Sequence, residues 1–221
     1  MGKNTPARAP SIDQWYSEHL DKHNPARFIE QVQKRYSVPA LERLVIGGQR
    51  MSRRAAVLAL NSLGDYRSNA VIGRALLDKD RGVRTLADSA IRSIWSRDGK
   101  QPQRRKLTAI MRLNAAKQYE EAGAEATLLI SEAAHIAEAW NQRAIAFYGE
   151  GRYAESIQDC KQALELNPYH FAAAAGMGQC YMRLGKQVLA LECFQRALTI
   201  NPDLEAVRAN VVYLRKALKR Q

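Results

Sequence analysis

The sequence predicts an all-α fold, a right-handed α-solenoid of helical hairpins, and three observations support it. Residues 137–170 and 171–204 repeat with a period of 34 residues, which is typical of helix–turn–helix units that stack on one another. Residues 38–97 carry a second series of apolar helical patterns separated by short polar turns. The last helix, 203–219, is amphipathic, and we expect it to cap the stack.

The two repeats agree where the chain must turn or pack closely. Gly151 and Gly185 stand where each first helix is expected to end, because glycine adopts a positive φ at little cost. Pro168 and Pro202 follow the second helices and stop them. Two helices that touch closely need small side chains at the crossing, and the repeats supply Ala144, Gly178, Ser156, Ala190, Ala163 and Ala197.

This pattern resembles the tetratricopeptide repeat (TPR) family. The family's signature positions are occupied by Trp140, Ala144, Phe147, Tyr153, Ala163, Pro168, Gly178, Tyr181, Ala190, Phe194, Ala197 and Pro202. Arg143 and Ala174 depart from it where larger apolar residues are usual, and Cys160 departs where an aromatic residue is common. The resemblance implies TPR units at 137–170 and 171–204 and a capping helix at 205–221.

A degenerate third unit is expected at 107–136. The segment Tyr119–Ala122 lines up with Tyr153–Ser156, which lies 34 residues later, although Ala134 stands where the terminal proline belongs. The polar segment 99–106 contains Gly99, Pro102 and three successive cations, so we expect it to be a basic junction between the two halves.

Residues 11–98 are expected to form a separate set of helices, and residues 1–10 to be disordered. Within 76–90 the stretch LLDKDRGVRTLADSA places an acidic turn before Val83-Arg84 and then spaced alanines. This stretch resembles HEAT-like repeats of the type found with phycobilin lyases. A generic alanine-rich helical hairpin is the alternative interpretation.

Composition and motifs point away from several functional classes. The 221 residues carry a formal net charge of +12, and no apolar run approaches the roughly 20 residues of a membrane span. The N-terminus lacks the apolar core of a signal peptide, and the three cysteines are expected to be buried thiols, so we expect a cytoplasmic protein. His19 and His23 are four residues apart but have no third ligand nearby, so we predict no metal site and no cofactor. With no catalytic constellation visible, we predict a protein that is not an enzyme.

The family resemblance implies a concave groove that grips a protein partner, as a peptide or a helix. The positions that face inward are Asn141, Gln142, Ile145, Tyr148, Gln179, Met182, Arg183 and Tyr213. Some family members bind a carboxylate through a clamp of Lys, Asn and Arg, and that clamp is absent here. A second interpretation, held about equally, is that the protein's own N-terminal segment fills the groove.

The alternative function is binding of nucleic acid or another polyanion. Residues 1–102 hold 18 Lys and Arg against 10 Asp and Glu, so the positive charge is concentrated in the N-terminal half. Candidate residues along one basic edge are Arg50, Arg53, Arg54, Arg81, Arg84, Arg104, Arg105 and Lys106. No aromatic residues are interleaved with them for base stacking, and arginine at such helix starts is often a structural partner of an acidic turn. We therefore rank a protein-binding scaffold first.

Overall fold

The computed structural model describes residues 11–219, so the predicted disorder of residues 1–10 lies outside the described residues. Residues 11–219 hold thirteen α-helices, one short 3₁₀ helix (η1, Tyr66–Ser68) and no strand, which confirms the all-α solenoid. The helices are α1 (Ile12–Lys22), α2 (Pro25–Gln33), α3 (Val38–Gly47), α4 (Arg50–Leu63), α5 (Asn69–Ala75), α6 (Arg81–Ser96), α7 (Gln101–Ala115), α8 (Tyr119–Glu132), α9 (Ala137–Gly149), α10 (Tyr153–Leu166), α11 (Phe171–Arg183), α12 (Gln187–Ile200) and α13 (Glu205–Leu218).

Local signals begin the helices of the N-terminal block, α1–α6. Asn24 caps α2 by accepting a hydrogen bond from the Arg27 amide, and Pro25 fills the first helical position. Asp80 caps α6 in the same way through the Val83 amide, at 2.9 Å. Apolar side chains of the block, such as Phe28, Leu60 and Ile91, are fully or almost fully buried in one core.

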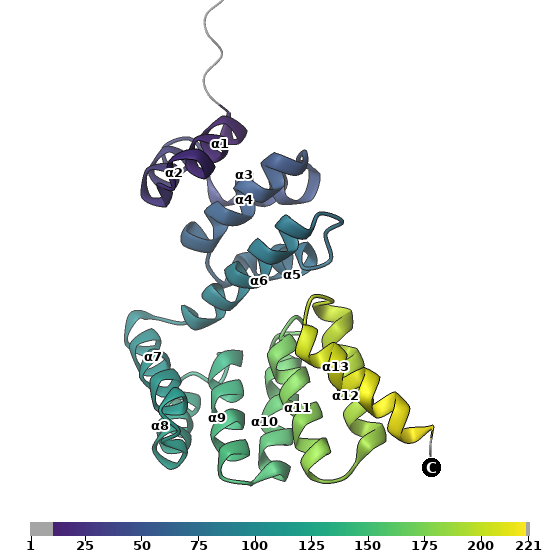
Figure 1. Cartoon of the computed structure of the whole chain (residues 1–221). Coiled ribbons are helices and arrows are strands. Elements are labelled where there is room, and N and C mark those ends of the chain that lie inside the picture. The colour runs from purple at the N-terminus through teal and green to yellow at the C-terminus, as the bar shows by residue number, and fades with distance from the viewer. Residues whose placement is uncertain (1–10, 220–221) are drawn as a thin grey trace, which may run out of the picture.

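The C-terminal layer is built from three antiparallel hairpins, α7–α8, α9–α10 and α11–α12, followed by α13 (Figure 1). Small residues lie at the crossings as the repeat predicts: Ala144 and Ala163 are buried, and the Ser156 hydroxyl donates to the Ala144 carbonyl at 2.7 Å. A Cβ atom at Gly178 would lie 2.6 Å from the Phe194 ring, so only glycine fits this crossing.

The three hairpins turn with the same backbone geometry. Gly151 and Gly185 have φ values of 79° and 71°, and Lys117, 34 residues before Gly151, has φ 61°. In each turn the residue that follows the one with positive φ donates its backbone amide to a carbonyl five residues earlier. Arg152 donates to Phe147 in this way, and Gln118 donates to Leu113. This is a Schellman ending, so the hairpin α7–α8 turns with the same backbone as the other two hairpins but without a glycine.

The predicted junction at 99–106 is shorter in the structure, because α7 already begins at Gln101. Pro102 suits the first turn of a helix, and the Gln103 side chain accepts from the Lys100 amide at 2.7 Å. Only residues 97–100 separate α6 from α7.

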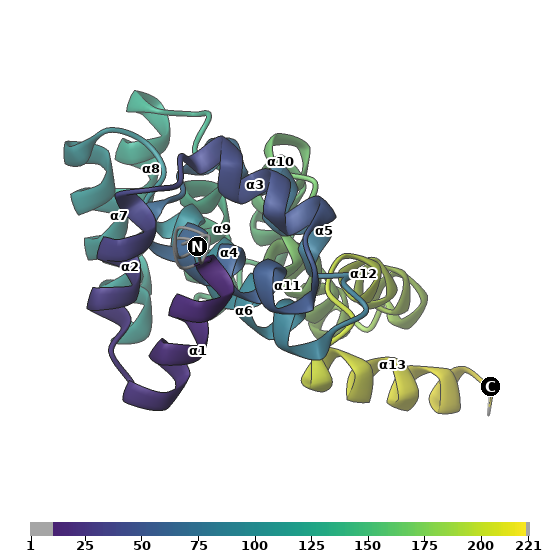
Figure 2. The same ribbon diagram turned by 90° about the horizontal axis from the view of Figure 1, so that it is seen from above.

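The chain folds back on itself after α6. Figure 1 shows α1–α6 standing over one edge of the C-terminal layer, and Figure 2 shows the same overlap from above. Residues of α5 and α6 contact the loops that precede α11 and α13: the Trp95 ring stacks on His170 at 4.2 Å, and Arg84 pairs with Asp203 at 2.8 Å. We call this contact between α5–α6 and the two loops, 167–170 and 201–204, the seam.

Candidate functional site

The predicted groove residues lie on α9, α11 and α13, the first helices of successive units. Ile145 and Tyr213 expose 40% and 59% of their surface and are two of the large apolar or aromatic side chains that face solvent among the described residues. Arg183 is also exposed, and its Nε donates to the Tyr148 hydroxyl at 3.1 Å across two neighbouring helices. Gln179 and Met182 lie on the same helix as Arg183 and are half-buried.

Two of the predicted groove residues are not at the surface. Asn141 and Gln142 expose only 5% and 6% of their surface. The Gln142 side chain accepts from Asn114 of α7 at 2.9 Å and donates to Glu138 at 2.6 Å. The chain's own α6 and α7 pack on this part of α9, while Ile145 further along the helix stays exposed.

A buried polar network that sequence reasoning missed starts at Glu138. The imidazole of His170 donates from Nε2 to the Glu138 carboxylate at 2.9 Å, because its Nδ1 accepts from the Ala173 amide at 3.2 Å. Burial acts to raise the pKa of Glu138, but hydrogen bonds from His170, Gln142 and Asn141 outweigh it and leave the pKa below the ordinary glutamate value. Glu138 is therefore a buried carboxylate that orders the start of α9, and no periodic signal in the sequence indicated it.

The seam continues this network toward the N-terminal block. Trp95, which stacks on His170, donates from its indole nitrogen to Asn69 at 2.7 Å. The Asn69 amide in turn donates to Asn167 at 2.9 Å. The asparagine of the Asn167-Pro168 pair thus contacts the other half of the molecule as well as shaping its own turn, where it accepts from the Tyr169 amide at 3.1 Å.

The predicted basic edge is largely engaged in ion pairs. Arg53 binds Asp78 with two hydrogen bonds of 2.7 and 2.9 Å, and Arg54 binds Asp80 with two of 2.7 and 2.8 Å. The hydrogen bond from Arg54 is the main reason that the pKa of Asp80 is lowered to about 2. These arginines join the acidic turn before α6 to α4, which is the structural role that the sequence left open for them.

The remaining edge residues divide between two surfaces. Lys106 pairs with Glu132, and the Arg104 guanidinium donates to the Gly99 carbonyl at 2.7 Å. A shallow groove on α7 is lined by Gln101, Arg104, Arg105, Thr108, Ala109 and Arg112. Arg50 is exposed near Asp80, and Arg81 and Arg84 line a separate cleft at the seam.

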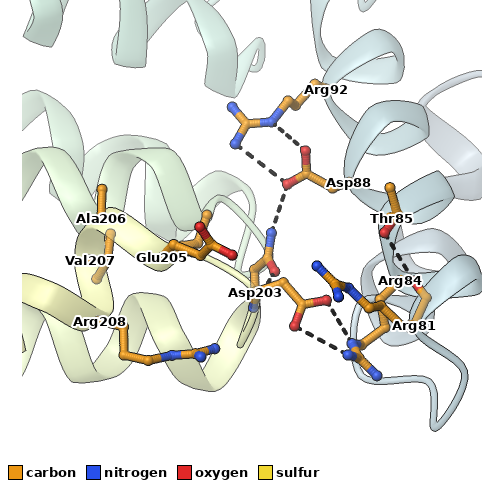
Figure 3. A pocket seen from close by; sticks show the side chains of 12 residues that line it. Arg81, Arg84, Thr85, Asp88, Arg92, Asp203, Glu205, Ala206, Val207 and Arg208 are labelled. Carbon is orange, nitrogen blue, oxygen red and sulfur yellow. Dashed lines mark hydrogen bonds and ion pairs between the residues drawn. The ribbon is translucent and has the colours of Figure 1, made fainter.

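That cleft lies between α6 and the start of α13 and holds about 680 Å³ (Figure 3). Its charged lining residues are Arg81, Arg84, Asp88 and Arg92 from α6, and Asp203, Glu205 and Arg208 from the loop and α13. Leu204, Ala206 and Val207 add an apolar part. Arg81 and Arg84 belong to the predicted basic edge, but no pattern in the sequence connects them with α13.

The cysteines of the described residues are not activated thiols. Cys160, Cys180 and Cys193 are free and buried, and burial raises the pKa of Cys193 to about 11 and also raises the pKa of Cys160 and Cys180. Such thiols stay protonated at neutral pH and are poor nucleophiles. No cluster of three metal-binding side chains occurs within 11–219, and no helix in that range is long and apolar enough to cross a bilayer.

Comparisons with known proteins agree with the repeat geometry. Residues 137–170 and 172–204 match the family profile of the tetratricopeptide repeat. A TPR repeat-containing protein of Rhizobium etli is 33% identical over 82 residues, which cover 37% of this chain and 40% of that protein. Human intraflagellar transport protein 70A is 36% identical over 59 residues, 27% of this chain and 9% of its own length. The chain thus spans less than half the length of these curated relatives.

Among solved structures, the TPR2AB domain–pHSP90 complex of yeast Sti1 is 13% identical, with a TM-score of 0.47 over 92% of this chain and 95% of that chain. YrrB, described as a TPR protein with an unusual peptide-binding site, is 17% identical, with a TM-score of 0.45 over 93% of this chain and all of that chain. The profile matches do not extend to residues 11–98, so the HEAT-like interpretation of that part stays a prediction. Residues 137–170 and 172–204 are tetratricopeptide repeats, and they form the hairpins α9–α10 and α11–α12.

Proposed function

We propose that the protein is a non-enzymatic interaction scaffold that binds a peptide or helix of a partner protein along the first helices of its repeats. The binding surface would consist of Ile145, Tyr148, Gln179, Met182, Arg183 and Tyr213, and we call it the groove surface. The observation that supports it most is the exposure of Ile145 on α9 and Tyr213 on α13, the helices on either side of α11, because exposed aromatic and large apolar side chains are frequent in protein interfaces.

Arg183 supplies the polar contact of this proposal. Its hydrogen bond to the Tyr148 hydroxyl holds both side chains at the surface, so less side-chain entropy is lost when a partner binds. A guanidinium retains several donors after one such bond and can bind an acidic side chain of the partner. Asn141 and Gln142 do not belong to the proposed surface, because the protein itself buries them.

The test starts from peptides selected against the full-length chain out of a random displayed library. We expect Arg183→Ala combined with Tyr148→Ala to weaken the selected peptides by about tenfold or more, which corresponds to about 1.4 kcal/mol of binding free energy. The exposed Tyr213→Ala change should weaken them without altering the melting temperature. Calorimetric or anisotropy titrations give the affinities.

A matched control replaces one apolar residue and one arginine on a second helix. Leu189→Ala with Arg196→Ala on α12 removes similar exposed groups away from the groove surface. If this control weakens the peptides as much as the groove variants do, the binding site lies on the second helices and the proposal fails.

A second candidate function, polyanion binding, is supported by the α7 groove. Its lining includes Arg104, Arg105 and Arg112 and no acidic residue. Binding to phosphates there would fall steeply with salt, since each neutralised phosphate releases counterions. We rank it second because Arg53, Arg54, Arg84 and Lys106 of the predicted basic edge are already paired with carboxylates.

A further inference from the structure

The seam cleft between α6 and α13 contains more guanidinium groups than its carboxylates neutralise. Arg84 binds Asp203 with two hydrogen bonds of 2.8 and 3.2 Å, and Arg92 binds Asp88 with two of 3.0 and 3.4 Å. In each pair the carboxylate neutralises the charge of the arginine that it binds. Within residues 11–219, Arg81 and Arg208 have no acidic partner, and the Arg208 side chain donates only to the backbone carbonyl of Pro202.

Arg81 and Arg208 reach the same region from opposite walls of the cleft. Figure 3 shows Arg81 extending from α6 and Arg208 extending from α13 on either side of Asp203. The pKa of Asp203 agrees with this placement: it is lowered mainly by the hydrogen bond from Arg84, and the positive charges of Arg81 and Arg208 lower it further. Asp203 is already bonded to Arg84, so the other two guanidiniums keep donors for a ligand.

The positive surface continues along α13. Arg208, Arg215 and Lys219 follow one another at intervals of seven and four residues, so they share one side of the helix, and all three are exposed. Arg215 and Lys219 form no ion pair within the described residues. This row leads away from the cleft along the last helix of the solenoid.

We propose that the cleft binds an acidic segment of a partner protein. One carboxylate would lie between Arg81 and Arg208, and following Asp or Glu residues would lie along Arg215 and Lys219. Guanidinium groups bind carboxylates with paired, charge-assisted hydrogen bonds, and the apolar Leu204, Ala206 and Val207 accommodate the stem of an acidic side chain.

A carboxylate segment fits the cleft better than a nucleic acid does. Asp203 and Glu205 also line the cleft and would repel the charged backbone of a nucleic acid, whereas an acidic peptide carries its charges on side chains and can turn its neutral backbone toward them. The lining contains no aromatic side chain on which a base could stack. The cleft shares no residue with the groove surface, so a result that contradicts one site does not contradict the other.

The experiment measures fluorescence anisotropy of a labelled hexaglutamate peptide with the full-length chain at low salt, near 50 mM by design so that screening stays weak. We expect saturable binding that Arg81→Gln with Arg208→Gln weakens by about tenfold or more. Arg43→Gln with Arg196→Gln removes the same charge from exposed sites elsewhere and should change affinity by no more than about twofold. Glu205→Gln should tighten binding, because it removes the one acidic group of the cleft that lacks a partner.

Several results would overturn the proposal. They are no saturable binding of hexaglutamate, equal loss in the cleft variant and the charge-matched control, or no gain from Glu205→Gln. A single-stranded DNA hexamer that binds through Arg81 and Arg208 more tightly than hexaglutamate would assign the cleft to nucleic acid instead. Melting temperatures of all variants should match that of the unmodified protein, because neither arginine makes an ion pair that holds the fold.

Discussion

At the scale of single residues, Lys117 marks a difference between the hairpin α7–α8 and the two that follow it. It adopts φ 61° at the position that glycine occupies in the other two hairpins, where a side chain normally costs about 1 kcal/mol or more. We therefore expect Lys117→Gly to raise the free energy of unfolding by up to about 1 kcal/mol. Chemical denaturation of the purified protein measures this change.

The glycine at the matching position of the next hairpin, Gly151, provides the control for Lys117. No atom lies within 4 Å of a Cβ added at Gly151, so Gly151→Ala tests backbone strain alone, and it should destabilise the protein by about 1 kcal/mol. If Lys117→Gly destabilises the protein as well, the conformation at this turn is not what limits the stability of the first hairpin.

At the scale of elements, the join between α4 and α6 depends on one carboxylate with two roles. Asp80 accepts from the Val83 amide as the cap of α6 and binds Arg54 of α4. Because its folded pKa is lowered to about 2 from 3.8, Asp80 adds stability that is fully present above about pH 4. That stability is lost as the pH falls from about 4 through 2.

We expect Asp80→Asn to lower the free energy of unfolding by roughly 1–3 kcal/mol near pH 6, the range for losing a hydrogen bond to a charged group. The gap between Asp80→Asn and the unmodified protein should shrink as the pH approaches 2, since the native carboxylate is then protonated too. Denaturant titrations at several pH values measure this. As a control, Asp21→Asn changes an exposed carboxylate on α1 and should leave the free energy of unfolding unchanged at each pH. If the difference between Asp80→Asn and the unmodified protein stays constant with pH, the lowered pKa of Asp80 is not due to Arg54.

At the scale of the whole molecule, a glycine reports on the seam. A Cβ at Gly73 of α5 would lie 2.3 Å from the Tyr169 ring, so Gly73→Ala should push the loop away and cost about 1–3 kcal/mol despite the better helix propensity of alanine. Gly123 lies inside α8, where a Cβ would meet Ala146 at an ordinary 3.7 Å, and Gly123→Ala should stabilise by up to about 1 kcal/mol. Opposite signs in thermal melts are expected. If both variants are more stable than the unmodified protein, Tyr169 does not press on α5.

Contacts between neighbours in sequence could be predicted, whereas contacts between distant segments could not. The hairpins follow from neighbours close in sequence, so the spacing of Gly151, Gly185 and the buried alanines was sufficient to predict them. The seam depends on how far the stack curls, which no local pattern encodes. No pattern in the sequence marks His170, yet it is fully buried between Trp95 and Glu138. The groove was predicted from repeat position alone, and that reasoning failed for Asn141 and Gln142 where α7 covers them.

The seam also changes how such a stack should come apart. In an open solenoid each hairpin touches only its neighbours, so the ends can fray while the middle stays folded. Here Asn69 binds Asn167 and Arg84 binds Asp203, contacts that span 98 and 119 residues of sequence. If either half unfolds, the other half loses these contacts, so we expect the two halves to unfold together as one cooperative unit. We also expect slower folding, because contacts so far apart in sequence require a long loop to close.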